Sequence, residues 1–357
     1  MIKFFEQEFS EEMKDAAVHA LQNERFVLGE SVAKFEEAFA KYLEVKYCVS
    51  VSSGTSALKI ALLSLGLKPK EKVATTDMTF IATSNSIIHA WGTPVLADIN
   101  EHTGLVDPAQ LKKVSDAKGV IPVHLYGQPC NMDELKELAE EKNWFVVEDA
   151  CQAHGATFNG KKAGSIGDAG AFSFYAAKNM TVGGDGGMIS TNNEEVAKQA
   201  KIYRDCGRTS KYEHSVVGFT ERLNTVSAAI GIEQLKRLDE WVEKRQKVAE
   251  LYRKNLNKEV LLDLIPNSTH AYHLFVIRSK EKAKIEAALQ KNEVQYGVHY
   301  PLPLNLQPIY KQLYGFKGGE FPQSEKFANE ILSLPVYPKM KSEDVLKVCE
   351  VVNGALQ

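Results

Sequence analysis

The chain has 357 residues, of which 44% are hydrophobic and 25% are charged, and its net charge is −3. This length predicts about two domains of ordinary globular composition. The small negative charge excludes the basic footprint of a nucleic-acid or anionic-membrane protein, and no apolar stretch reaches the roughly 18 residues of a membrane span.

Cysteine and histidine usage argues against disulfides and metals. The five cysteines are scattered without a Cys-x-x-Cys pair, and the nine histidines show no metal-ligand spacing. The N-terminus turns acidic before a secretory apolar core could form. We therefore expect a protein of the reducing cytoplasm without a metal site. His124 and His154 are expected to be hydrogen-bonded structural histidines.

The first half of the chain alternates helices and strands. Ser10 is the expected N-cap of a first helix, because Glu11 and Glu12 follow in its first turn. Such alternation predicts a largely parallel sheet with helices on both faces. Strands are expected at 47–52, 72–75, 94–97, 119–123 and 144–147, and helices at 56–65 and 133–141.

The second half predicts a smaller unit. Apolar stretches at 169–175 and 188–191 precede a nearly continuous helical pattern from 224 to 256. No repeat or low-complexity linker marks a boundary, so we place it near residue 240 and predict domains at 1–240 and 241–357. The second is expected to be a compact α+β unit, with strands at 272–278 and 294–298, a helix at 280–290 and two further helices.

The most specific chemistry lies between Trp144 and Ser190. Asp149 follows an apolar strand, and Lys178 follows a second apolar stretch just before a run of glycines. A lysine amine can form a Schiff base with pyridoxal phosphate (PLP), and a carboxylate can keep its pyridine nitrogen protonated. A carboxylate and a protonated pyridine nitrogen ~4 Å apart, at an effective dielectric of about 20, attract each other by about 4 kcal/mol. This energy corresponds to roughly three units in the pKa of the pyridine nitrogen. Lys178 and Asp149 are therefore the candidate catalytic residues.

A phosphate-binding turn is predicted at Ser53-Gly54-Thr55-Ser56, between the strand at 47–52 and the helix that follows. Gly54 lets the backbone approach a phosphate. The free amides of the helix start and the hydroxyls of Thr55 and Ser56 can bind it. A strand, a small-residue turn and a helix also occur without any ligand, so the turn is significant because Asp149 and Lys178 follow it.

In combination, these motifs resemble the PLP-dependent sugar aminotransferases of the DegT/DnrJ/StrS group, in the fold-type-I aspartate aminotransferase superfamily. The resemblance implies an α/β fold-type-I PLP-transferase, with a large domain built on a mostly parallel sheet and a smaller C-terminal α+β domain. It covers nearly the whole chain, through RFVLGESVAKFEEAFAKYL, VSSGTSALKIAL, DMTFIATSNSI, IPVHLYGQPCNMDEL, VVEDACQAHGA, FSFYAAKNMTVGGDGGMIST, VHYPLPLNLQP and ILSLPVYP.

The resemblance also implies roles for individual residues. Lys178 would be the Schiff-base lysine and Asp149 the partner of the pyridine nitrogen. Gln152 would hydrogen-bond the phenolic oxygen of the cofactor. Phe80 would stack on its ring, although an ordinary core aromatic is the alternative interpretation. The residues that would hold the phosphate are Ser173, Gly54 and Thr55.

One segment departs from the family pattern. Members commonly read Gly-Phe/Tyr-Asn-x-Arg-Leu before the long helix, and the Asn reaches the phosphate of the neighbouring subunit. This chain has Gly218-Phe219-Thr220-Glu221-Arg222-Leu223. Thr220 keeps a hydroxyl for that contact but has a shorter reach. The family pattern nevertheless implies a homodimer with shared active sites.

The implied reaction transfers an amino group, from glutamate, to a nucleotide-linked keto sugar in amino-sugar or polysaccharide precursor biosynthesis. His299 and Tyr300 match a His-Tyr-Pro motif that family members place at the nucleotide-sugar site, often from the second subunit. Arg204 and Arg222 lie in segments that can supply positive charge there. The alternative is that this proline-rich loop packs only for folding.

Three other functions are weighed against this one. A nicotinamide dehydrogenase does not fit, because the glycines at 183–187 precede a strand instead of opening a helix after one. A PLP-dependent sugar dehydratase would carry His in place of the Schiff-base lysine, so Lys178 argues against it. A non-catalytic regulator on the same scaffold stays open, although it need not keep the lysine, the acid and the phosphate turn together.

Overall fold

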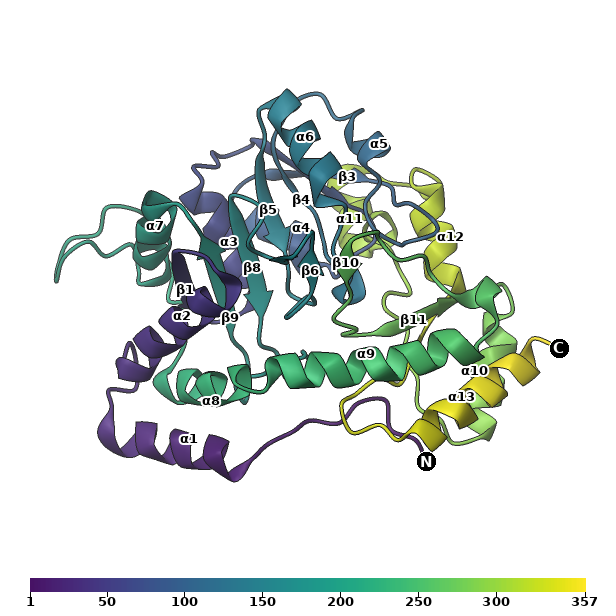
Figure 1. Ribbon diagram of the computed structural model, residues 1–357. Helices are drawn as coiled ribbons and strands as arrows, with labels where there is room; N and C mark the ends of the chain where they lie inside the picture. Colours follow the sequence, from purple (N-terminus) through teal and green to yellow (C-terminus); the bar gives the residue numbers. More distant parts are fainter.

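A computed structural model describes all 357 residues, and its centre is a seven-stranded sheet with the strand order β1-β9-β8-β5-β4-β2-β3 (Figure 1). Strand β9 is antiparallel to both of its neighbours, and all other neighbouring strands run parallel. The prediction of a mostly parallel sheet is confirmed. The strands are β1 (Tyr47–Val51), β2 (Lys72–Thr76), β3 (Thr93–Ala97), β4 (Ala117–Ile121), β5 (Phe145–Asp149), β8 (Ala169–Ser173) and β9 (Gly187–Thr191).

Helices cover both faces of this sheet because alternate strand residues point to opposite sides. Val147 of β5 packs in a core with Leu58 and Leu62 of α3. Its neighbour Val146 packs on the other side, with Leu135 of α6. The helices of this part are α1 (Glu11–Asn23), α2 (Glu30–Leu43), α3 (Gly54–Ser64), α4 (Ala82–His89), α5 (Pro108–Leu111), α6 (Met132–Lys142), α7 (Glu194–Arg204) and α8 (Thr225–Leu235).

A second unit follows α9 (Leu238–Asn255), which runs along the molecule toward both chain termini (Figure 1). Trp241 in the first half of α9 belongs to the core beneath the sheet, whereas Tyr252 in its second half belongs to the C-terminal core. The expected boundary near residue 240 therefore falls within a helix that both cores share. The other elements here are β11 (Phe275–Arg278), β12 (Ile331–Leu334), α10 (Lys282–Lys291), α11 (Pro308–Tyr314), α12 (Pro322–Glu330) and α13 (Ser342–Ala355).

Two expectations for the C-terminal unit are wrong. Residues 294–298 form no strand, because Val294 bridges to Ile2 and Gly297 bridges to Ser333, so no single partner extends the pairing. Three helices follow instead of two, because Pro308 and Pro322 each start a helix at its first turn. A small three-stranded sheet completes the fold, with β6 (Thr157–Phe158), β7 (Lys161–Lys162) and β10 (Ser268–Thr269).

The helix start at Ser10 is confirmed in position but not in its hydrogen bond. Helix α1 begins at Glu11 with Ser10 as its N-cap, yet the Ser10 side chain makes no capping bond. No helix of the protein combines the length and the apolar composition that crossing a membrane requires.

Strand β9 passes so close to the turn between β1 and α3 that its first residue must be glycine. A Cβ on Gly187 would lie 2.2 Å from the carbonyl oxygen of Ser53, which is a backbone atom and cannot rotate away. The equivalent position on Gly184 has no heavy atom within 4 Å. The end of the glycine run therefore serves close packing of β9 against the Ser53–Gly54 turn.

We expect Gly187→Ala to lower the free energy of unfolding by about 1–3 kcal/mol, because the added methyl group overpacks the backbone. Gly184→Ala is the matched control and should change it by less than about 0.5 kcal/mol. Urea denaturation of both variants measures the difference, and equal values would contradict the close approach.

Candidate active site

The candidate site is a cavity of about 500 Å³ at the carboxyl ends of the parallel strands. Chain segments that follow β1, β2, β5 and β8 meet there. The C-terminal unit closes the cavity with His273, just before β11, and with His299 and Tyr300, between α10 and α11. The predicted residues that line it are Gly54, Thr55, Phe80, Asp149, Gln152, Ser173, Lys178, His299 and Tyr300.

Asp149 is the last residue of β5, and its carboxylate is held from two sides. Thr83 Oγ1 of α4 donates to Asp149 Oδ2 at 2.7 Å. The backbone N–H of Cys151 donates to Oδ1 at 3.2 Å. Thr83 is supported in turn by Thr79, at 2.9 Å between the hydroxyls. Asp149 is only 5% exposed, so its carboxylate has a fixed orientation.

Lys178 lies in the loop after β8 and shares the cavity with Asp149. Burial lowers the pKa of the Lys178 ammonium below its ordinary value, while Cys151 and Asp149 act in the opposite direction. A lowered pKa increases the fraction of neutral amine, which is the nucleophilic form of the side chain.

The N-terminus of α3 forms the part of the cavity that is suited to an anion. The first amides of a helix have no partner inside the helix. A Cβ on Gly54 would lie 2.7 Å from Cys151 Sγ and 2.8 Å from Ser173 Cβ, so only glycine fits against these side chains. Ser53 caps the helix by accepting from the N–H of Ser56 at 3.1 Å.

Ser56 does not line the cavity, which contradicts its expected phosphate contact. Its hydroxyl lies 3.0 Å from Ser52 Oγ and 2.8 Å from Ser53 Oγ, and the residue is 6% exposed. The hydroxyl therefore belongs to the helix cap. Ser53, which lines the cavity, takes the place expected for Ser56.

Gln152 joins the large domain to the loop of the C-terminal unit that carries His299 and Tyr300. Its Oε1 accepts from the N–H of Tyr126 at 2.7 Å, and its Nε2 donates to the Tyr300 hydroxyl at 3.1 Å. The Tyr126 hydroxyl donates to the carbonyl of His299. These bonds fix Tyr300 and His299 against the large domain.

His299 is a neutral imidazole. Its Nδ1 lies 2.9 Å from Ser333 Oγ, and burial, assisted by the charge of Lys178, lowers the pKa of His299 to about 4. It can therefore exchange hydrogen bonds with a ligand but adds no positive charge near neutral pH. Burial raises the pKa of the Tyr300 phenol, which keeps it a hydroxyl.

Phe80 is 53% exposed at the cavity, and its ring centroid lies 5.6 Å from that of Tyr300. This exposure argues against the interpretation as an ordinary core aromatic. Its face is open to a planar ligand.

The donor set of the cavity fits pyridoxal phosphate. An amine with a lowered pKa and a rigidly oriented carboxylate line the same space, and the helix start at Ser53–Thr55 supplies anion-binding groups beside the Ser173 hydroxyl. The close approach of Gly54 to Cys151 and Ser173 gives this helix start its place at the cavity.

Arg204 lies away from the cavity, which contradicts its expected substrate contact. It is 6% exposed, and its guanidinium donates to Glu36 of α2 and, at 2.7 Å, to the carbonyl of Ser50 in β1. Glu36 Oε1 also accepts from the Ser50 N–H at 2.9 Å. This buried ion pair joins α7 to α2 across the edge of the sheet.

The segment 218–223 also lies outside the cavity of its own chain. Arg222 donates to Asp205 Oδ1 at 2.8 Å, and Glu221 pairs with Lys59 of α3. Thr220 is exposed, with its hydroxyl 3.3 Å from Cys206 Sγ. The segment is therefore fixed on the flank of α3, and its Thr220 hydroxyl can be reached from outside.

The two buried histidines near the site differ. His124 Nε2 lies 2.9 Å from Glu148 Oε2, and its Nδ1 accepts from the N–H of Cys130 at 3.1 Å, so it is the hydrogen-bonded structural histidine that was expected. For His154 this expectation is wrong: neither ring nitrogen has a partner, and the ring packs against Phe172 at 5.3 Å between centroids.

Sequence reasoning missed several residues of the site. Thr83, in the first turn of α4, orients Asp149, and a second threonine four residues earlier, Thr79, is a signal that could have identified the pair. Tyr126 and His273 carry no comparable signal, because their places depend on the packing of the C-terminal unit.

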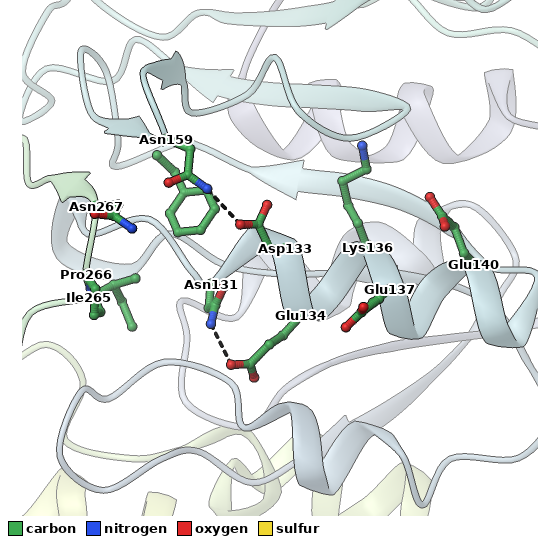
Figure 2. A pocket seen from close by; sticks show the side chains of 11 residues that line it. Asn131, Asp133, Glu134, Lys136, Glu137, Glu140, Asn159, Ile265, Pro266 and Asn267 are labelled. Carbon is green, nitrogen blue, oxygen red and sulfur yellow. Dashed lines mark hydrogen bonds between the residues drawn. The ribbon is translucent and has the colours of Figure 1, made fainter.

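A second hollow, of about 470 Å³, lies between α6 and the segment before β10 (Figure 2). Four of its polar side chains bond to one another, since Asn159 Nδ2 donates to Asp133 at 2.7 Å and Asn131 Nδ2 donates to Glu134 at 2.6 Å (Figure 2). The side chains of α6 that face it are mostly acidic, and no predicted site residue lies there.

Comparison with known families gives a match over nearly the whole chain. The model of the DegT/DnrJ/EryC1/StrS aminotransferase family matches residues 7–353. A pleiotropic regulatory protein of Geobacillus stearothermophilus is 39% identical over 93% of this chain and 91% of its own. The dTDP-3-amino-3,6-dideoxy-alpha-D-galactopyranose transaminase of Aneurinibacillus thermoaerophilus is 35% identical over 97% of this chain and 95% of its own.

Solved structures agree with this match. DesV of S. venezuelae superposes with a TM-score of 0.96 and 33% identity, over 100% of this chain and 99% of DesV. NtdA of Bacillus subtilis, solved with bound cofactor PMP, superposes with a TM-score of 0.88 and 30% identity, over 97% of this chain and 82% of NtdA.

We expect Arg204→Met to lower the free energy of unfolding by about 3–5 kcal/mol, because Glu36 would remain buried without its partner. The double variant Arg204→Met/Glu36→Leu should recover most of this loss, since it removes both charges. Urea denaturation measures both. A stable Arg204→Met protein with weakened substrate binding would restore the residue to the substrate site.

Proposed function

Because the chain belongs to the DegT/DnrJ/EryC1/StrS aminotransferase family, whose enzymes depend on pyridoxal phosphate, we propose that it transfers an amino group from glutamate to a nucleotide-linked keto sugar. The observation that carries this proposal is one cavity lined both by Lys178 with Asp149 and by His299 with Tyr300. The first pair serves the cofactor, and the second is suited to a polar substrate.

When bound, the cofactor supplies an electron sink for the bonds around the amino carbon. Lys178 would hold the cofactor covalently and, when free, would act as the general base and acid that moves a proton at the substrate carbon. The lowered pKa of Lys178 suits this role because it increases the fraction of neutral amine that can accept a proton. Asp149, fixed by Thr83, would hold a proton on the pyridine nitrogen.

The remaining contacts of the cofactor are proposed from the resemblance, for residues that line the cavity. The amides at the start of α3, with Thr55 and Ser173, would bind the phosphate. Gln152, which is bonded to Tyr300, would hydrogen-bond the phenolic oxygen. Phe80 would stack on the ring.

The sugar side of the proposal rests on His299 and Tyr300. A neutral imidazole and a neutral phenol can both donate and accept, as sugar hydroxyls require. The relatives include transaminases or aminotransferases named for dTDP- and UDP-linked sugars and a GDP-perosamine synthase, and these names support a nucleotide-linked substrate. Glutamate as the donor follows from the resemblance to the family.

Two alternatives are less well supported. A sugar dehydratase is disfavoured because position 178 is lysine. A regulator is suggested by the name of one relative, the pleiotropic regulatory protein, but this chain retains the lysine, the acid and the anion-binding helix start in one cavity. That arrangement favours catalysis.

The active unit is proposed to be a homodimer whose sites take residues from both subunits. Val217 and Tyr212 are 75% and 81% exposed in the extended loop after α7, and Trp91 is 45% exposed beside Phe219 (Figure 1). Such exposed apolar side chains are typical of an interface. Thr220 lies in this region, where the cofactor phosphate of a neighbouring subunit could accept a hydrogen bond from its hydroxyl.

We expect His299→Ala to raise the KM for the keto sugar about 3- to 10-fold, because the variant loses at least one hydrogen bond to it. The glutamate half-reaction should change less, since an amino acid is too small to reach all of the sugar contacts. His19→Ala, on the exposed face of α1, is the matched control. Stopped-flow measurement of each half-reaction, with a panel of nucleotide-linked keto sugars, tests this. Equal losses in both halves would assign His299 to the cofactor or the fold.

Subunit mixing tests the shared site. Lys178→Ala removes the covalent link to the cofactor, and Thr220→Glu places a negative charge near the partner's phosphate, so each variant alone should be inactive. A random equimolar mixture should regain about one quarter of the wild-type activity, because half of the dimers are mixed and each has one intact site. Absence of any recovery in confirmed mixed dimers would reject a shared site.

A further inference from the structure

The segment that carries Lys178 has no helix or strand of its own, so its shape depends on contacts from elsewhere. We call residues 176–181 the lysine loop. The Lys178 N–H donates to the carbonyl of Tyr175, the residue just before this loop, at 2.9 Å. At its two ends, however, the carbonyl of Ala176 and the N–H of Thr181 bond to side chains from distant parts of the chain.

Both of these side chains lead to the N-terminal segment, residues 2–8. Gln7 Nε2 donates to the Ala176 carbonyl at 2.6 Å. Gln234 of α8 accepts from the Thr181 N–H through Oε1 at 3.1 Å and donates to the Glu8 carbonyl through Nε2 at 3.1 Å. Gln234 is 1% exposed, so water does not compete for these two bonds.

The other end of the same segment contacts the loop that carries His299. The Ile2 N–H donates to the Glu293 carbonyl and the Gln295 N–H donates to the Ile2 carbonyl, both at 2.9 Å. The Phe4 ring lies 10° from parallel to the His299 ring, with 5.8 Å between centroids. Figure 1 shows this stretch running from the C-terminal unit to α1.

We propose that the N-terminal segment positions Lys178 relative to His299, and that Gln234 is the positioning residue through which it holds the lysine loop. Residues 2–8 contact the His299 ring through Phe4 and the backbone of the lysine loop through Gln7 and Gln234, and the lysine loop has no secondary structure of its own. The inference rests on the PLP dependence of the proposed function and is independent of the identity of the sugar.

The contacts that hold the lysine loop should affect the pKa of the Lys178 nitrogen. Burial disfavours the cationic form of this nitrogen, both in the free amine, whose pKa it lowers, and in a protonated imine linked to the cofactor. A loop that admits water should therefore raise the pKa of this nitrogen. In the holoenzyme, the visible absorbance of the lysine-linked cofactor changes with the protonation of this nitrogen. Its pH midpoint therefore reports how tightly the loop is held.

The matched comparison is Gln234→Met against Gln128→Met. Gln128 is also buried, at 3% exposure, and it also joins two backbone groups, accepting from the Ile265 N–H at 3.3 Å and donating to the Asp263 carbonyl at 3.2 Å. Both variants lose two hydrogen bonds to backbone groups and should lose similar stability, since the further contact of Gln234 is a weak bond to the sulfur of Met13. Gln128 does not contact the lysine loop.

We expect Gln234→Met to raise the pH midpoint of the absorbance by about 0.5 unit or more and to speed hydrogen exchange at the Thr181 amide about 10-fold. Gln128→Met should change neither. An unchanged midpoint in Gln234→Met, or an equal shift in Gln128→Met, would overturn the proposal.

Gln7→Met keeps the test valid if Gln234→Met does not fold, because Gln7 is exposed and its loss leaves the core intact. It should shift the midpoint in the same direction, and an unchanged midpoint in a folded Gln7→Met protein would reject the hold at Ala176. Failure of every keto sugar to react would refute the proposed substrate without altering the shift of the midpoint.

Discussion

The parallel pairing of β5 with β8 is the constraint on which the rest of the site depends. Asp149 lies opposite Ala171 in the register of the two strands, so the carboxylate and the chain leaving β8 toward Lys178 emerge at the same edge of the sheet. Because strand β9 then returns antiparallel, the lysine loop is confined to that edge. An acid and an amine with 28 residues between them in the sequence thus share one cavity.

This arrangement requires β5 to carry two adjacent acids into the interior. Glu148 is 0% exposed, yet its carboxylate accepts from the amides of Gly164 and Gly167, each at 2.7 Å, and lies 2.9 Å from His124. Burial acts to raise the pKa of Glu148, but these hydrogen bonds outweigh it and hold the pKa below its ordinary value. With its neighbour satisfied in this way, Asp149 is free to face the cavity.

Sequence patterns predicted the elements that local information specifies. The apolar runs of β1, β5 and β8 fall within about two residues of their expected places, because continuous hydrophobic runs are typical of buried parallel strands. The turn before α3 was also predicted, but the choice between Ser53 and Ser56 was not, because helix capping decides where each hydroxyl points. Local patterns do not contain that information.

The errors concern partners that are distant in the sequence. Arg204 was expected at the substrate because its actual partner, Glu36, lies 168 residues away and no local sequence pattern indicates that ion pair. The strand expected at 294–298 has the right apolar alternation, but its two bridges go to opposite ends of the chain. His154 has no hydrogen-bond partner although its residue type predicts one. In each case tertiary packing, and not propensity, made the choice.

Helix α9 couples the unfolding of the two units of the chain. Its first half packs in the core beneath the sheet and its second half packs in the C-terminal core. Unfolding of either core therefore removes packing contacts from the same helix. A linker would let each unit melt on its own, whereas a continuous shared helix couples their melting. Heating should therefore produce a single calorimetric transition, in which the measured and van't Hoff enthalpies agree.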